Sequence, residues 1–205
     1  MDPAASIKGT AFAFVVEKAL KHISSGEISR DKLARRLPSG GLEAVERPVV
    51  LVAWYDIRIY AGLMELLTEV EGHGESGYLV RHGGEAAERL LQQGFYQQME
   101  YVKSMAPGDE TDPHVRYETF GRDLRRLVSL WPSIFNFSQL QVRHDPDHPD
   151  RYMLETSDGT ALPEALGWSL QGFYNRMAAE HDCPDLWRLD HPRQRPVRHR
   201  MTRAL

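Results

Sequence analysis

The sequence predicts an α+β fold in which an N-terminal helical part packs on a C-terminal antiparallel sheet. Up to Trp131, apolar residues recur every three or four positions, as they do on the buried face of a helix. Beyond Trp131, two pairs of short alternating segments flank one amphipathic helix, which predicts two β-hairpins separated by a long helix. A length of 205 residues suits one domain over residues 1–205. We expect its helical part at about 7–131 and its sheet part at about 134–203.

Apolar periodicity and end signals give the expected helices. Ser29 is placed to cap the second helix and Pro38 to stop it, and the loop at 38–41 follows. Gly83-Gly84 and Gly94 predict a bend or break in the fourth helix. The expected helices are 10–23, 29–37, the part of 49–70 that follows Trp54, 76–105, 117–131 and 161–181.

Alternation gives the expected strands. The segments 135–143 and 152–156 form one hairpin around a turn at 144–150, and 186–189 and 196–201 form the other. Arg198 and Arg200 alternate with Val197, His199 and Met201, which favours a charged edge strand. The alternative is that residues 191–205, which are rich in arginine, make the protein an adaptor that binds a polyanion. This tail contains no Phe, Trp or Tyr on which bases could stack. We therefore do not expect nucleic acid binding.

Composition is that of a globular protein, with 41% hydrophobic and 26% charged residues. The net charge of −4 is too small to indicate a polyanion or polycation as the main partner. Cys183 is the single cysteine, so no intramolecular disulfide forms. The longest apolar run, residues 48–55, is too short to cross a bilayer, and no targeting segment is visible. We therefore expect a cytoplasmic protein without a transmembrane segment.

No catalytic or cofactor signature is present: the chain lacks a G-x-S-x-G elbow, a Walker loop and a G-x-G-x-x-G turn. The turn 144–150 carries two histidines and three aspartates, but Asp and Pro are favoured there by turn geometry alone. We predict no metal and no cofactor. The alternative is an enzyme that uses His82, or the pair His144 and His148, together with a carboxylate.

Aromatic side chains with polar tips are frequent in the central helices, and such rings build either a core or the lining of a ligand pocket. His82 lies on an apolar helix face, where a buried imidazole can bind a ligand or serve as a core residue. The candidate ligand-binding residues are Trp54, Tyr55, Tyr60, His82 and Tyr96.

Several short motifs resemble a paralogous myxobacterial family of uncharacterised proteins of about 200 residues. They are Ile7-Lys8-Gly9-Thr10-Ala11-Phe12, Leu33-Ala34-Arg35-Arg36-Leu37-Pro38, Trp54-Tyr55 and the helix with Gly83-Gly84. That family is similar in layout to haem-nitric-oxide-binding and vinyl-reductase-like sensory domains, which implies helices packed on a sheet around a pocket. It implies no activity and no catalytic residue.

This chain departs from the pattern of the myxobacterial family in one place and from that of the haem-binding domains in another. Asp56 follows Trp54-Tyr55 where the family has proline. The haem-binding cousins hold porphyrin through Tyr-x-Ser-x-Arg, and the nearest segment here, 117–122, misplaces the hydroxyl and the arginine. We therefore expect no haem. The sequence favours a non-enzymatic regulatory domain that contacts a protein partner, including a homodimer, and holds a small apolar ligand between helices and sheet.

Overall fold

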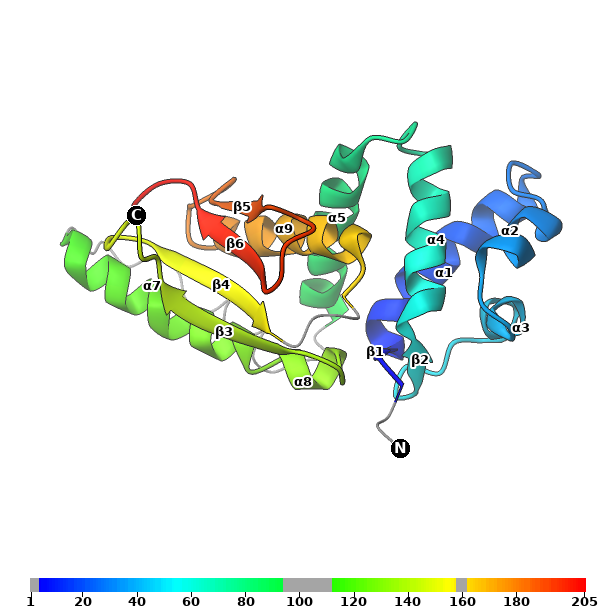
Figure 1. Ribbon diagram of the computed structural model, residues 1–205, viewed down its shortest axis with the longest axis horizontal. Coiled ribbons are helices and arrows are strands. Elements are labelled where there is room, and N and C mark those ends of the chain that lie inside the picture. Colours follow the sequence, from blue (N-terminus) through cyan, green and yellow to red (C-terminus); the bar gives the residue numbers. More distant parts are fainter. Residues whose placement is uncertain (1–3, 94–111, 158–161) are drawn as a thin grey trace.

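The computed structural model describes residues 4–93, 112–157 and 162–205, and it confirms the α+β class (Figure 1). The N-terminal helices lie at one end of the molecule and an antiparallel four-stranded sheet lies at the other. The elements before the sheet are β1 (Ser6–Lys8), α1 (Gly9–Ser24), α2 (Arg30–Arg36), α3 (Gly41–Glu46), β2 (Trp54–Asp56), α4 (Ile57–Val70), α5 (Ser76–Gln93), α7 (Pro113–Val128) and α8 (Trp131–Ile134).

The cap of α2 is as predicted, because the Ser29 side chain accepts a hydrogen bond from the backbone N–H of Lys32 at 3.1 Å. Three features of this half were missed. The predicted helix 117–131 ends at Val128, and α8 starts at Trp131 as a separate short helix. Helix α3 follows the expected loop directly, and its six residues are too few to show a helical repeat. Strands β1 and β2 pair with each other, and α4 begins only at Ile57, where the Asp56 side chain accepts from the N–H of Arg58 at 2.8 Å.

The prediction at Gly83-Gly84 was a bend or a break, and the break is wrong. Helix α5 continues through both glycines, and the predicted continuation beyond residue 93, with Gly94, lies outside the described residues. The glycines serve close packing instead. A Cβ atom on Gly83 would lie 1.7 Å from the backbone oxygen of Ser169, and one on Gly172 would lie 1.7 Å from that of Val80. Helix α5 therefore crosses α9 (Glu164–Ala179) with the two backbones in contact.

The sheet consists of β3 (Gln139–His144), β4 (Tyr152–Ser157), β5 (Trp187–Asp190) and β6 (Val197–Met201). Both predicted hairpins form, and the spatial order is β3-β4-β6-β5 with every pair antiparallel. The expectation that Arg198 and Arg200 mark an edge strand is wrong, because β6 pairs with β4 on one side and β5 on the other. The edges are β3 and β5.

One face of the sheet is covered by helices. Tyr152 of β4 lies against Gly121 of α7, and the ring of His199 in β6 reaches the backbone oxygen of Gly167 in α9. Arg198 and Arg200 alternate with His199, so they project to the opposite face. Edge strand β5 is tied to α9, since the side chain of Asn175 both accepts from the N–H of Trp187 at 2.7 Å and donates to its carbonyl at 3.1 Å.

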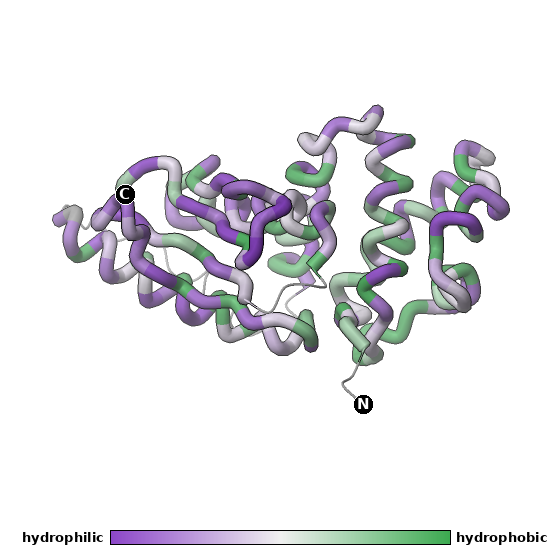
Figure 2. The backbone as a smooth tube through the Cα atoms, in the orientation of Figure 1, coloured by the Kyte–Doolittle hydropathy of each residue, from purple (hydrophilic) through white to green (hydrophobic). Residues whose placement is uncertain are grey.

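The N-terminal helices contact the sheet part through α5 on α9 and through β1. The N–H of Ser6 donates to Asn136 at 2.7 Å, and Ile7 forms a β-bridge with Phe135. Buried apolar residues of both parts belong to one core cluster. Figure 2 shows a hydrophobic segment between α3 and β2, which includes Val50 and Val52, 55% and 76% exposed. Within the described residues, no helix combines the length and apolarity needed to span a bilayer.

Candidate functional site

A cavity of about 70 Å³ lies where the N-terminal helices meet the sheet part. Helices α1, α4, α5, α7, α8 and α9 line it, and the sheet contributes Leu140. Its walls are mostly apolar, with Phe14, Leu90, Trp131 and Phe173 among them. Spaces between helices are a usual location of small-molecule sites, and most such sites are larger, at roughly 300–1,000 Å³.

His82 is a polar residue in this cavity wall. Its side chain is 2% exposed and stacks on Phe14, with ring centroids 4.9 Å apart. In the part of the chain that the structure describes, neither ring nitrogen of His82 has a hydrogen-bond partner. Burial lowers the pKa of His82 to about 3, the charge of Lys18 acts in the same direction, and Glu71 opposes it. The imidazole is therefore neutral at pH 7, with one donor and one acceptor unused.

Two tyrosines add hydroxyl groups to the same wall. Tyr60 of α4 is 5% exposed. Burial raises the pKa of its hydroxyl to about 12, and this effect outweighs a hydrogen bond with Ser169 that lowers the pKa. Tyr174 of α9 is 3% exposed, burial raises its pKa, and its hydroxyl has no hydrogen-bond partner among the described residues. These groups are uncharged at neutral pH, so the interior of the cavity offers hydrogen bonds without charge.

The other candidate residues lie elsewhere. The ring of Tyr55 stacks on Phe12 at 4.4 Å between centroids, and its hydroxyl accepts from the N–H of Val50 at 2.8 Å. Trp54 is 41% exposed, with the ammonium of Lys8 4.4 Å from its ring centroid. Neither lines the cavity, and Tyr96 lies outside the described residues. The structure thus brings Tyr60 and His82 together.

Sequence reasoning missed Ser169 and Tyr174, both on α9. The prediction treated that helix as an amphipathic core helix, whereas nearly every side of it is buried. Polar residues on an otherwise buried helix are the signal that was available. Gln171 and Asn175 are explained by their hydrogen bonds to β5, while the hydroxyl of Tyr174 is left unpaired among the described residues.

Arg89 is the charged residue at the rim of the cavity. Its guanidinium pairs with Glu17, with Nη2 2.7 Å from Oε1. Arg89 and Phe14 also line a shallow surface groove with Glu88 and Arg176. The charge of Arg89 at the rim is therefore paired with that of Glu17, and the residues farther inside, His82, Tyr60 and Tyr174, are neutral.

A second cavity of about 20 Å³ shares Leu127 and Tyr174 with the first. Asp123 faces it and is 3% exposed, with Arg126 Nη1 3.6 Å and Arg122 Nε 3.7 Å away as ion-pair partners. Burial raises the pKa of Asp123, and burial lowers the pKa of His181, which lines the same space. The volume suits about one water molecule, so a substrate does not fit beside this carboxyl–imidazole pair.

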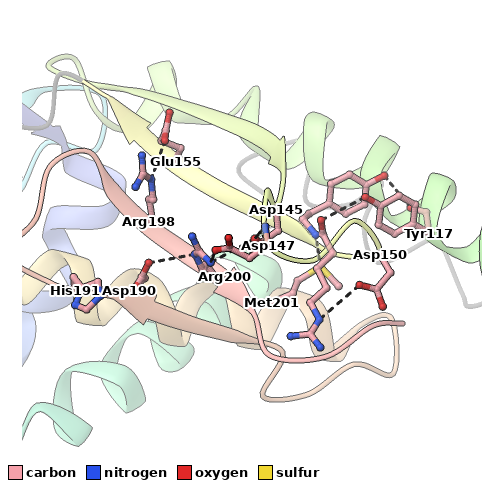
Figure 3. A network of polar contacts seen from close by, with 12 residues as sticks. Tyr117, Asp145, Asp147, Asp150, Glu155, Asp190, His191, Arg198, Arg200 and Met201 are labelled. Carbon is pink, nitrogen blue, oxygen red and sulfur yellow. Dashed lines mark hydrogen bonds and ion pairs between the residues drawn. The ribbon is translucent and has the colours of Figure 1, made fainter.

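The turn 144–150 is part of an ion-pair network centred on Arg200 (Figure 3). The guanidinium of Arg200 lies 3.4 Å from Asp145, 2.6 Å from Asp147 and 3.2 Å from Asp190. His144 Nδ1 is 2.7 Å from the hydroxyl of Tyr117. The carboxylates that resembled metal ligands thus bind an arginine, and no cluster of three His, Cys, Asp or Glu suited to a metal occurs within the described ranges.

Other arginines of the tail also have partners within the fold. Arg198 pairs with Glu155 at 3.0 Å, Arg193 with Glu164 at 3.1 Å, and Arg203 donates to the carbonyl of Pro184 at 2.7 Å. Arg193 and Arg198 are therefore paired with acidic groups, and Arg203 is hydrogen-bonded to the backbone.

Arg200→Leu is expected to lower the free energy of unfolding by about 2 kcal/mol, because the carboxylate of Asp145, 2% exposed, loses its cation. This figure allows for solvent screening of the partly exposed guanidinium. Urea unfolding measures the change. Arg193→Leu is the control, since its 87% exposed side chain is expected to contribute less than about 0.5 kcal/mol. Equal effects of the two substitutions would contradict the role of Arg200.

No family model, no curated protein and no solved structure matches this chain.

Proposed function

We propose that this protein is a non-enzymatic regulatory domain that binds a small, mostly apolar molecule in the cavity of about 70 Å³. The observation that carries the proposal is the position of His82, buried in that wall with both ring nitrogens unpartnered among the described residues. An unsatisfied buried polar group costs stability, and a ligand in the cavity that hydrogen-bonds to His82 would remove that cost.

The position of the cavity suggests how ligand binding would act on protein contacts. Its wall includes Tyr60 of α4, His82 of α5 and Tyr174 of α9, which are elements of both parts of the fold. A ligand that contacts all three favours the arrangement in which these helices pack together. Binding then changes the surface that the two parts present jointly to a partner protein.

The described residues favour binding over catalysis. With a pKa of about 3, His82 is not in the imidazolium form at neutral pH, so it is neither a general acid nor more than a weak base. The charged rim residue Arg89 is already paired with Glu17. The second cavity, where Asp123 and His181 meet, holds about 20 Å³. An enzyme based on a histidine and a carboxylate is thus the weaker candidate.

Xenon tests the cavity itself, because it binds dry apolar cavities without needing a hydrogen bond. We expect xenon-dependent NMR shifts of methyl groups of Leu90 and Leu170, which line the cavity. Ala86→Leu is expected to abolish these shifts, since Ala86 faces the same space. Arg81→Leu, at an exposed position of the same helix, is the control and should leave them unchanged. Absence of xenon shifts in the unsubstituted protein would overturn the proposal.

A protein partner, a second copy of the chain as partner, and a cytoplasmic location stay predictions, as does the relationship to the myxobacterial family. Native mass spectrometry of protein isolated from its own cells tests the first two directly. A mass of two chains, or of one chain with another protein, supports action through protein contacts. Monomer alone, with and without xenon or ligand, would contradict it.

A further inference from the structure

We propose that the apolar turn, residues 50–54, inserts into the surface of a lipid bilayer that carries anionic headgroups. The turn lies between α3 and β2 (Figure 2). Its exposed large apolar side chains are Val52 at 76%, Val50 at 55%, Trp54 at 41% and Leu51 at 39%. Elsewhere in the described residues, Val115 is the one large apolar side chain with comparable exposure. Such a concentration marks a surface that contacts a membrane or a protein.

The backbone of the apolar turn is held by the start of α1. The N–H of Gly9 donates to the carbonyl of Ala53 at 2.9 Å, and the N–H of the next residue donates to Leu51 at 3.1 Å. The N–H of Ala53 in turn donates to the carbonyl of Val50 at 3.0 Å. These bonds satisfy backbone groups without water, as a segment that enters lipid requires. The turn therefore presents its side chains on an ordered backbone.

The size of the exposed patch favours lipid over a protein partner. Four partly exposed side chains offer at most a few hundred Å² of apolar surface, whereas each partner in a stable complex buries roughly 800 Å². The open groove beside the turn adds little, since Ala13 and Val16 in its floor are 8% and 2% exposed. Insertion into a bilayer needs no matching surface, because mobile acyl chains close around a few apolar side chains.

The charges around the apolar turn suit anionic headgroups. Residues 47–55 contain no Asp or Glu, and the acidic residues that flank this range, Glu46 and Asp56, are each paired with an arginine. The ammonium of Lys8 lies 4.4 Å from the ring centroid of Trp54. Tryptophan and lysine are both favoured at the boundary between headgroups and acyl chains, where the ring meets the apolar region and the ammonium meets phosphate.

Sedimentation of the full chain with vesicles of phosphatidylcholine and phosphatidylglycerol in equal amounts tests the inference. We expect the protein to bind, and the double variant Val50→Ser/Val52→Ser to bind about tenfold more weakly, because much of the inserted apolar area is lost. Val115→Ser, at the exposed apolar position on α7, is the control and should bind like the unsubstituted protein. Lys8→Gln is expected to weaken binding by about fivefold on these vesicles and to have no effect on pure phosphatidylcholine.

Tryptophan fluorescence reports the insertion itself. Trp54 is exposed, whereas Trp131 and Trp187 are 5% and 1% exposed and Trp168 is partly buried. We expect lipids brominated on their acyl chains to quench the emission of the bound protein. Most of this quenching should be absent in Trp54→Phe, which keeps an aromatic ring at the same place.

Two results would overturn the inference: no binding to the anionic vesicles, or equal binding of the unsubstituted protein and the double variant. If the double variant instead lost a dimer or a defined protein complex while vesicle binding stayed unchanged, the turn would be a protein contact and the inference would be wrong. Neither Val50 nor Val52 lines the cavity, so xenon binding is expected to persist in the double variant. The inference therefore stands or falls separately from the proposed function.

Discussion

Gly83→Ala is expected to lower the free energy of unfolding by about 3 kcal/mol, although alanine is the better helix former. The reason is the crossing of α5 and α9. The new Cβ atom would lie 1.7 Å from the backbone oxygen of Ser169, and a backbone oxygen cannot rotate away as a side chain can. The helices must separate by more than an ångström, which disturbs the core along the whole contact.

The neighbouring residue supplies a matched control. A Cβ atom on Gly84 would meet nothing closer than the backbone oxygen of Gly172 at 3.8 Å, which is ordinary contact. Gly84→Ala is therefore expected to stabilise the protein by about 0.5–1 kcal/mol through helix propensity alone.

Thermal unfolding followed by circular dichroism distinguishes the two glycine variants. At about 2–4 °C per kcal/mol for a chain of this size, we expect Tm to fall by roughly 6–12 °C in Gly83→Ala and to rise by roughly 2 °C in Gly84→Ala. Gly172→Ala should behave like Gly83→Ala, because its Cβ atom would lie 1.7 Å from the backbone oxygen of Val80. Equal Tm values for Gly83→Ala and Gly84→Ala would mean that α5 and α9 do not approach this closely.

When the pH is lowered from 7 to 5, His82 and His199 together are expected to reduce the free energy of unfolding by about 4 kcal/mol, about half from each. Burial lowers the pKa of His82 to about 3. It lowers the pKa of His199 to about 4, against the raising effect of a hydrogen bond to the carbonyl of Gly167, at 2.9 Å from Nε2. Both rings stay neutral in the folded protein over this range.

The sign of the pH effect follows from proton uptake. In the unfolded chain each imidazole has a pKa near 6.5 and takes up a proton as the pH falls below that value. The folded protein does not, so the unfolded state binds more protons and stability decreases. The loss begins near pH 6.5 and is complete below about pH 4 for His199 and pH 3 for His82. His181 acts in the same direction, because burial lowers its pKa. His22 acts in the opposite direction: burial disfavours its charge, but Glu71 and Glu27 outweigh that and raise its pKa.

Urea unfolding at pH 7, 6 and 5 measures this loss. His82→Leu is expected to halve it, and at pH 7 to stabilise the protein by about 1 kcal/mol because an unpaired buried imidazole is removed. Gly84→Ala, which removes no titratable group, is the control and should leave the pH dependence unchanged. Stability independent of pH between 7 and 5 would show that His82 and His199 are not held neutral by burial.

Local sequence signals were sufficient for most elements of this fold. The Ser29 cap and the helix that it starts, both β-hairpins and the long helix α9 follow from patterns within a few residues of each element. Helix α3 and the pair β1–β2 were not predicted, because elements of six and three residues contain less than two periods of any hydrophobic repeat.

The site could be predicted only in part. His82 and Tyr60 were found because a polar group on an apolar helix face is visible in a single sequence. Trp54 and Tyr55 were chosen for the same reason, but Tyr55 stacks on Phe12 and Trp54 faces solvent, which depends on how β1 pairs with β2. Tyr174 was missed because its neighbours come from the distant helices α5 and α7.

By itself, the sequence determined the α+β class and the elements whose hydrogen bonds join residues close together in the chain. A helix is capped by the residues that flank it, and the two strands of a hairpin are joined by the turn between them. Only the tertiary structure decided that Gly83 allows close packing of α5 on α9 and does not break α5. The same holds for the position of Arg198 and Arg200 on an inner strand. It also holds for the cavity that His82, Tyr60 and Tyr174 line together. These facts join residues far apart in the chain, and the free energy that brings them together comes from burying surfaces that no local pattern identifies as partners.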